Sequence, residues 1–313
     1  MSRKQAQRWA NMMPSGRSGR PLMGVYDLMQ DDIQSAFFTN PYGAQDYFVD
    51  LNVVADGDGK SWDTAVGTAA AAIVLSDASI GLTANRWWAR RNRIFVCGDE
   101  LHEDITALSE KTDIIGVGTD LSPYPRFMHS WAITTGVKGA RFINVGFWNN
   151  AADVGMAIPI NSHGNEFWNC HFDSNALGTH GLRITSSSQT KIMGCEFTNA
   201  AGTKYTTAAV DLVGACHNLE INDCYIEGVI AIAKDATATS SGRIVNSTLV
   251  ATNLIVDDDS STLVVANCDL ITAANSGNAF ADTAMDMNLN LAVGNQLVSG
   301  DSNGPFPNII VLA

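Results

Sequence analysis

Charged residues are scarce in this chain. They make up 16% of its 313 residues, against about 25% in an ordinary soluble domain. A surface with so little charge must be neutral and polar, or be covered by another molecule, which indicates assembly. No stretch approaches the roughly 20 consecutive apolar residues of a membrane span, and the basic start is not followed by the apolar run of a secretory signal. We therefore expect a soluble protein made in the cytoplasm.

The charge that is present is unevenly placed. Residues 1–26 hold five basic side chains and no acid, so the rest of the chain carries −18, that is, the net −13 less those five positive charges. An acidic body argues against nucleic acid as a partner of that part and against unaided binding of anionic polysaccharide. The basic segment, in contrast, is suited to an acidic partner surface.

One short pattern recurs seven times along the second half of the chain. The first and sixth of its six positions are apolar, the third is Asn, Gly or Asp, and the fourth is a small residue. The second and fifth positions can hold any residue. The copies are FINVGF (142–147), FWNCHF (167–172), IMGCEF (192–197), INDCYI (221–226), IVNSTL (244–249), VANCDL (265–270) and, more weakly, AVGNQL (292–297). Their fourth residues follow one another at intervals of 21 to 29 residues.

The third position of the pattern predicts a tight bend. Only Asn, Gly and Asp occur there, the residue types that enter the left-handed backbone region at low cost. These residues are Asn144, Asn169, Gly194, Asp223, Asn246, Asn267 and Gly294. After the bend, the fourth and sixth residues point to the same side, because strand side chains alternate. Like residues then stack on like residues.

The cysteines fit this inward register. Four of the six occupy the fourth position of a copy: Cys170, Cys195, Cys224 and Cys268. A disulfide framework is the alternative, but an inward row of unpaired thiols in a dry core suits these positions better. The same reasoning argues against zinc binding, and the sequence suggests no cofactor.

Coils of 21 to 29 residues, made of short strands with no room for a crossover helix, predict an all-β fold, the right-handed parallel β-helix, over residues 46–300. The leucine-rich repeat lacks its signature here, and an antiparallel sandwich is the remaining alternative. Near-helical spacing of Trp62, Val66, Ala69 and Ile73 predicts a small capping helix at 63–77. Residues 1–45 are predicted to form an extended arm and 301–313 a tail.

The start of the predicted solenoid resembles that of pectate-lyase-like β-helix proteins. The resemblance lies in DGDGKSWDTA (56–65), RIFVCGDELHEDI (93–105) and DIIGVGTD (113–120), and the coils FWNCHF and VANCDL continue it, so that it covers about 46–300. That superfamily includes polysaccharide lyases, glycoside hydrolases and many bacteriophage tailspikes and virion surface proteins. The resemblance therefore implies the fold and leaves the function open.

Catalytic candidates are weak. A glycosidase needs two carboxylates roughly 5–9.5 Å apart, and Asp153 and Asp173 precede a THGLRI segment (179–184) that is similar to part of the polygalacturonase-like hydrolases. That family's Asn-Thr-Asp and paired-Asp elements are absent. The alternative interpretation of His180 and Gly181 is a turn entering a strand, so no catalytic set is assigned beyond the candidates Asp153, Asp173 and His180.

Two other segments have residues suited to binding. Asp257, Asp258 and Asp259 form the only acidic run and are the candidates for a calcium site, with a solvated turn as the default interpretation. NRWWARRNR (85–93) joins Trp87 and Trp88 to four arginines. It could stack on sugar or nucleic acid, but a contact between subunits or with the arm is favoured.

These observations favour a non-enzymatic virion protein of a bacteriophage, either a tailspike-like receptor-binding protein or a capsid decoration protein. Residues 1–45 would anchor it to other virion proteins, and a host-surface polysaccharide is a possible ligand of the solenoid. We expect a homo-oligomer, with a trimer favoured, located in the virion and assembled in the host cytoplasm, and no membrane partner. The alternative is a polysaccharide-degrading lyase or glycoside hydrolase on the same fold. A bacterial surface or adhesion protein is a third possibility.

Overall fold

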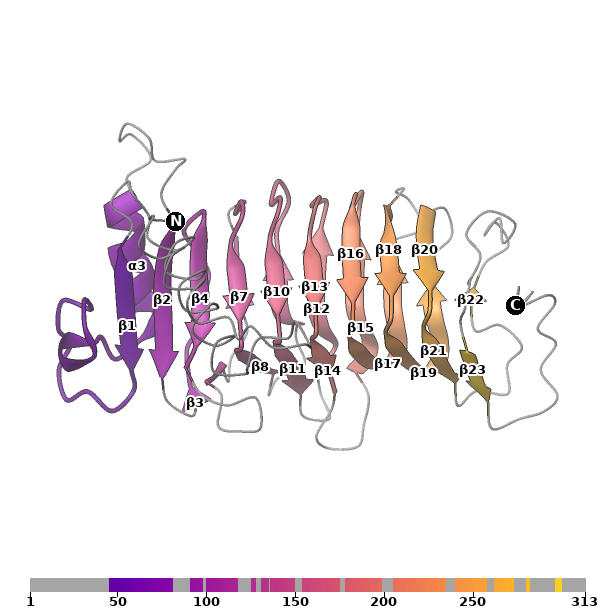
Figure 1. The fold of residues 1–313 in the computed structure, drawn as a ribbon, viewed down its shortest axis with the longest axis horizontal. Coiled ribbons are helices and arrows are strands. Elements are labelled where there is room, and N and C mark those ends of the chain that lie inside the picture. Colours follow the sequence, from indigo (N-terminus) through magenta and orange to yellow (C-terminus); the bar gives the residue numbers. More distant parts are fainter. Residues whose placement is uncertain are drawn as a thin grey trace, which may run out of the picture.

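A computed structural model describes residues 45–80, 91–97, 100–117, 125–127, 131–134, 136–149, 154–174, 178–198, 205–234, 240–257, 262–272, 280–281 and 296–299. The predicted arm (1–45), apart from its last residue, and the predicted tail (301–313) lie outside these residues. Within them, strands stack along one long axis, and one α-helix lies at the β1 end (Figure 1).

Sheet A has nine strands, all parallel, each one coil further along the chain than its neighbour. They are β1 (Asp46–Asp50), β2 (Asn92–Cys97), β4 (Thr112–Gly116), β7 (Arg141–Ile143), β10 (Glu166–Trp168), β13 (Lys191–Met193), β16 (Leu219–Asn222), β18 (Ser241–Val245) and β20 (Thr262–Ala266). Figure 1 shows them side by side along the solenoid.

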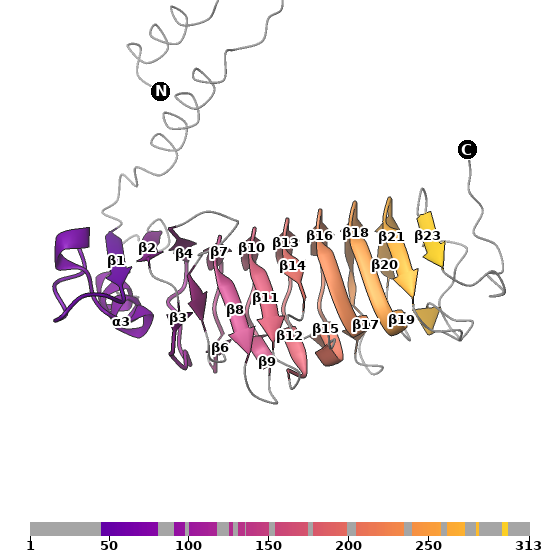
Figure 2. The same ribbon diagram turned by 90° about the horizontal axis from the view of Figure 1, so that it is seen from below.

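Sheet B forms the other wall from two strands per coil. The first set is β3 (Glu100–Leu101), β5 (Arg126–Phe127), β8 (Gly146–Asn149), β11 (His171–Ser174) and β14 (Glu196–Phe197), and the second is β6 (Trp131–Ala132), β9 (Val154–Ile158), β12 (His180–Thr185) and β15 (Tyr205–Val213). The long β17 (Tyr225–Lys234) pairs with both β14 and β15 and so joins the sets. β19 (Thr248–Asp257), β21 (Asp269–Thr272), β22 (Phe280–Ala281) and β23 (Gln296–Ser299) follow (Figure 2).

This architecture is the predicted right-handed parallel β-helix, and the predicted bends are confirmed. Six of them have positive φ: Asn144 (54°), Asn169 (48°), Gly194 (62°), Asp223 (56°), Asn246 (51°) and Asn267 (53°). Gly294 lies outside the described residues. Bend residues donate their backbone N–H to the next coil, as Asn169 does to the Met193 carbonyl at 2.9 Å. The bends thus stack as a ladder.

The predicted inward rows are confirmed as well. Cys170, Cys195, Cys224 and Cys268 are buried and form no disulfide bond. The backbone N–H of Cys170 lies 3.4 Å from the Cys195 sulfur, and that of Cys195 lies 3.4 Å from the Cys224 sulfur. Beside them, Phe147, Phe172 and Phe197 stack with centroids 4.9 and 4.3 Å apart.

The capping helix exists but begins later than predicted. Trp62–Thr64 is a 3-10 turn, and the helix α3 spans Ala69–Ile80. Val66 is not part of the helix, because it pairs with Val49 of β1 and its N–H donates a hydrogen bond to the Phe48 carbonyl at 3.0 Å. The Glu103 carboxylate accepts the N–H groups of Ala69 and Ala70 at 2.8 and 2.9 Å, which fixes the first turn.

No helix among the residues with a described structure has the length and apolar character needed to cross a membrane.

Candidate functional site on the outer face of sheet B

One polar cluster surrounds the predicted candidate His180, the first residue of β12. Its Nε2 lies 3.4 Å from Oδ2 of Asp211 on β15, and its Nδ1 lies 3.0 Å from Thr179 Oγ1. Arg183 donates from Nε to the same Asp211 oxygen at 2.7 Å. The pairing of Arg183 with Asp211 on neighbouring strands brings these groups together. His180 and Asp211 are only 6% and 8% exposed, so this cluster chiefly holds two strands together.

A tight approach at Gly181 explains why the chain has glycine beside this histidine. A Cβ atom there would lie 2.9 Å from the Ala209 carbonyl oxygen and 3.0 to 3.1 Å from the rings of Phe197 and Tyr205. The alternative interpretation, a turn leading into a strand, was correct about the strand. It did not foresee the polar contacts of His180.

A second cluster lies on the outer face of β8, β11, β14 and β17, where strand register forms two rows. The first row places His171 beside Glu196 and Glu196 beside Tyr225. The second begins with Trp148 beside Asp173. These side chains point outward because Phe172 and Phe197, their neighbours in sequence, point into the core.

The hydrogen bonds and the exposure of these side chains determine which of their groups a ligand could contact. His171 Nε2 is 2.7 Å from Thr198 Oγ1, and the Tyr225 hydroxyl donates to Glu227 at 3.2 Å. Tyr225 is 37% exposed and Glu196 is exposed, whereas Asp173 is 7% exposed and accepts from the Ser174 N–H at 2.7 Å. The face thus combines an accessible aromatic ring with carboxylates.

The environment of His171 favours its neutral form. Burial is the main cause that lowers its pKa, and the positive charge of Arg126 acts in the same direction. The carboxylates of Glu196 and Asp173 oppose this effect without reversing it. The neutral imidazole has one nitrogen that accepts a hydrogen bond and one that donates. It can therefore orient either a hydroxyl group or a water molecule beside Glu196.

Arg126 and Trp148 bound the cluster at its β5 side. The Arg126 guanidinium carbon lies 5.6 Å from the Trp148 ring centroid, a cation–π contact. Arg126 also binds Glu100 at 3.3 Å. Trp148 and Tyr225 are thus three strand spacings and two residues apart, about 16 Å between their Cα atoms, with Asp173 and Glu196 between them.

The predicted site residues have different outcomes. Asp173 and His180 lie on consecutive strands, β11 and β12, but in separate clusters. Asp153, Asp258 and Asp259 lie outside the described residues, as does the side chain of Asp257, which ends β19. Within the described ranges, no group of three or more His, Cys, Asp or Glu residues is placed to hold a metal ion.

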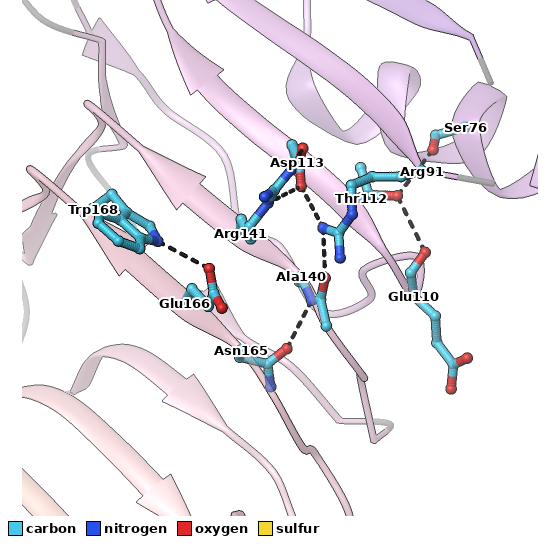
Figure 3. A network of polar contacts seen from close by, with 11 residues as sticks. Ser76, Arg91, Glu110, Thr112, Asp113, Ala140, Arg141, Asn165, Glu166 and Trp168 are labelled. Carbon is cyan, nitrogen blue, oxygen red and sulfur yellow. Dashed lines mark hydrogen bonds and ion pairs between the residues drawn. The ribbon is translucent and has the colours of Figure 1, made fainter. Parts of the chain in front are cut away.

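The basic-aromatic segment 85–93 is described only from Arg91 onward. Arg91 donates to Asp113 at 2.6 Å and to the Gly139 carbonyl at 2.9 Å, as Figure 3 shows for Asp113. Arg93 binds Asp46 through two bonds of 2.7 and 2.6 Å. These two arginines therefore act within the chain, while Trp87 and Trp88 lie outside the described residues.

Sequence reasoning missed His171, Glu196, Asp211 and Glu227. A signal existed for the first two, because each is the fifth residue of a copy of the repeat, the position treated as variable. That position alternates with the inward fourth and sixth residues and must point outward. No such signal marks Asp211, which is placed by the pairing of β12 with β15.

The molecule is thus a parallel β-helix with a polar outer face, and its likeness to known proteins is at the level of the fold. No family model matches the sequence, and no curated protein matches it. Among solved structures, the pectin methylesterase from Aspergillus niger is similar, with 13% identity and a TM-score of 0.46, over 85% of this chain and 88% of that one.

The preferred prediction, a non-enzymatic bacteriophage virion protein, was wrong. The solved structure to which the chain is similar is a pectin methylesterase and no virion protein, and that likeness concerns the fold alone. The physical reason is that a β-helix serves as scaffold for either class, so a low charge content and a basic start do not separate them. The predicted virion location is not tested and stays a prediction. The predictions about the arm's partners and the oligomeric state stay predictions.

Proposed function

We propose that this protein is a polysaccharide-degrading enzyme, a glycoside hydrolase, acting on the outer face of β8, β11, β14 and β17. The observation that carries the proposal is the placement of Asp173 and Glu196 on adjacent strands, between Trp148 and Tyr225. Strand spacing and a two-residue offset put their Cα atoms about 8 Å apart. Two carboxyl groups act on one glycosidic bond at separations of roughly 5–9.5 Å, and side chains that start at this spacing can reach that range.

The chemistry requires one carboxyl group to protonate the leaving oxygen and the other to activate water or attack the sugar. Glu196 is exposed and can meet water, while neutral His171 beside it can orient that water or a sugar hydroxyl. Tyr225, at 37% exposure, offers a ring on which a sugar can stack.

The charge of this face selects the class of substrate. Asp173, Glu196 and Glu227 are acidic, and Arg126 already binds Glu100. A uronate about 8 Å from one of these carboxylates meets a repulsion of about 2 kcal/mol at an effective dielectric constant of about 20. We therefore propose a neutral polysaccharide as substrate, in preference to a polyuronate.

The test measures new reducing ends released from neutral polysaccharides and from polygalacturonate. Wild-type protein is expected to cleave a neutral polymer, and Asp173→Asn and Glu196→Gln are each expected to lower kcat by about 100-fold or more. Asp269→Asn is the matched control, since Asp269 lies on the same face, two strands beyond Tyr225. No cleavage of any neutral polymer, or unchanged activity in both variants, would refute the proposal.

A further inference from the structure

The outer face of sheet A carries charges of alternating sign along eight consecutive strands. Strand register places one such residue on each strand, and we call this set the charge row: Asp46, Arg93, Asp113, Arg141, Glu166, Lys191, Glu220 and Arg243. Neighbours pair within the chain, with Arg93 2.6 Å from Asp46 and Lys191 3.1 Å from Glu166. Arg141 binds the fully buried Asp113 through two bonds (Figure 3).

The charge row makes this strip of the surface electrically neutral. Its four acids and four bases sum to zero, whereas the whole chain carries −13. Two copies that approach through any acidic part of the surface repel each other. Approach through the charge row avoids that repulsion.

An apolar row runs beside the charge row, two residues further along each strand. It consists of Phe48, Phe95, Ile115, Ile143, Trp168 and Met193. All six side chains are at least partly exposed, and Trp168 is 37% exposed. At one end Trp62, 40% exposed, packs edge-on against Phe48 at 4.9 Å.

The order of charges is self-complementary over all eight strands under one two-fold rotation. A two-fold axis parallel to the strands, between β7 and β10, matches the first strand of one copy with the eighth of the other. Asp46 then faces the partner's Arg243, Arg93 faces the partner's Glu220 and Arg141 faces the partner's Glu166. The buried Asp113 lies opposite the partner's Lys191 but beneath its own Arg91 and Arg141. An axis along the solenoid would instead place like charges opposite each other.

The same rotation matches the apolar rows. Ile143 of one copy faces Trp168 of the other, and Ile115 faces Met193. We propose that sheet A is the interface of an antiparallel homodimer, with a second copy of this chain as its occupant. An isologous contact of this kind closes on itself and builds no fibre.

The size of the strip sets the expected strength. Eight strands and two to three outward rows span about 35 by 15 Å, or about 500 Å² per copy. The total, about 1,000 Å², lies at the lower limit for a specific interface. We therefore expect a reversible dimer whose population depends on protein concentration.

The first experiment is sedimentation equilibrium of the full chain over a range of concentrations. Wild-type protein is expected to approach twice the 33.4 kDa chain mass, and Trp168→Glu to weaken dimerisation by about tenfold or more. Tyr225→Glu is the matched control, because Tyr225 is also 37% exposed but lies on sheet B. A wild-type monomer or trimer, or equal effects of the two variants, would overturn the proposal.

The second experiment tests the antiparallel order of the strands. Arg243→Glu alone and Asp46→Arg alone each place like charges opposite each other twice per dimer, so both are expected to weaken it. Combining the two substitutions restores opposite charges across the interface, so the double variant is expected to dimerise more tightly than either single variant. Additive weakening in the double variant would refute this geometry. Unfolding curves of each variant show whether the chain itself is folded.

The dimer and the proposed hydrolase activity are tested separately, since sheet A contributes no residue to the sheet B site. Trp168→Glu is expected to keep the specific activity of the wild type while it loses the dimer.

Discussion

Phe172 is the position where the stacked core can be tested most directly. Its ring is fully buried and lies between those of Phe147 and Phe197, with centroids 4.9 and 4.3 Å away and the planes inclined by 17° and 3°. It also meets the edge of Phe167 at 5.7 Å. Replacement by alanine removes a large buried ring from the middle of this stack.

The expected loss of stability depends on whether the residues around Phe172 can move into the cavity that alanine leaves. Phe→Ala changes in cores cost about 3–5 kcal/mol, and the cost is greatest where the site cannot collapse. Parallel hydrogen bonds on both sides of β11 hold the neighbouring strands at their spacing, so the cavity should stay open. We therefore expect Phe172→Ala to lower the free energy of unfolding by about 4–5 kcal/mol. Phe172→Leu, which keeps most of the volume, should cost less than about 1.5 kcal/mol.

The assay is urea unfolding followed by circular dichroism at one fixed protein concentration. A double-mutant cycle of Phe172→Ala with Phe197→Ala isolates their stacking, for which we expect a coupling of about 0.5–1.5 kcal/mol. A loss below about 2 kcal/mol for Phe172→Ala, or equal losses for alanine and leucine, would show that the ring does not lie in a rigid, dry stack.

Two further predictions concern protonation. Folding lowers the pKa of His171, so the unfolded chain binds its proton more tightly than the folded chain. The stability of the protein should therefore fall as the pH drops below about 6.5. In thermal unfolding curves His171→Gln should make this fall less steep, and an unchanged pH dependence would contradict the prediction. Burial raises the pKa of Cys195 well above its usual value, so a thiol reagent at about pH 8 should label it only after denaturation. The same is expected of Cys170, Cys224 and Cys268, because the reagent cannot reach their buried sulfur atoms. Half-buried Cys97 should react first, and rapid native labelling of the four would contradict the inward register.

The two proposals assign different roles to the two outer faces of the solenoid. Sheet A presents a neutral, partly apolar strip, and sheet B presents carboxylates with an exposed aromatic ring. In the proposed dimer the sheet A faces are buried against each other. The sheet B faces then point away from the interface and stay open to a long polymer.

The repeat was predictable because its causes are local. A left-handed bend admits few residue types, so Asn144, Asn169 and Asp223 were visible as bends before any coordinate was known. Strand alternation then placed Cys170 and Phe172 inward. Each conclusion needs only neighbours in the chain and the geometry of one strand.

The helix boundary and the candidate site depended on tertiary structure. Val66 pairs with Val49 instead of joining the helix, because its conformation is set by pairing with a strand and not by local helix propensity. Glu196 meets His171 only because the pairing of β11 with β14 brings the two strands into register.

The sequence by itself determined the coil, the bends and the inward rows, since all three follow from backbone conformation and alternation along one strand. Only the tertiary structure decided which outward residues become neighbours, because contacts between coils depend on loop lengths that vary from coil to coil. The alternating charge row from Asp46 to Arg243 is the clearest case. Neighbouring residues of the row are 20 to 47 positions apart in sequence, so their charges alternate in space only because the strands pair side by side.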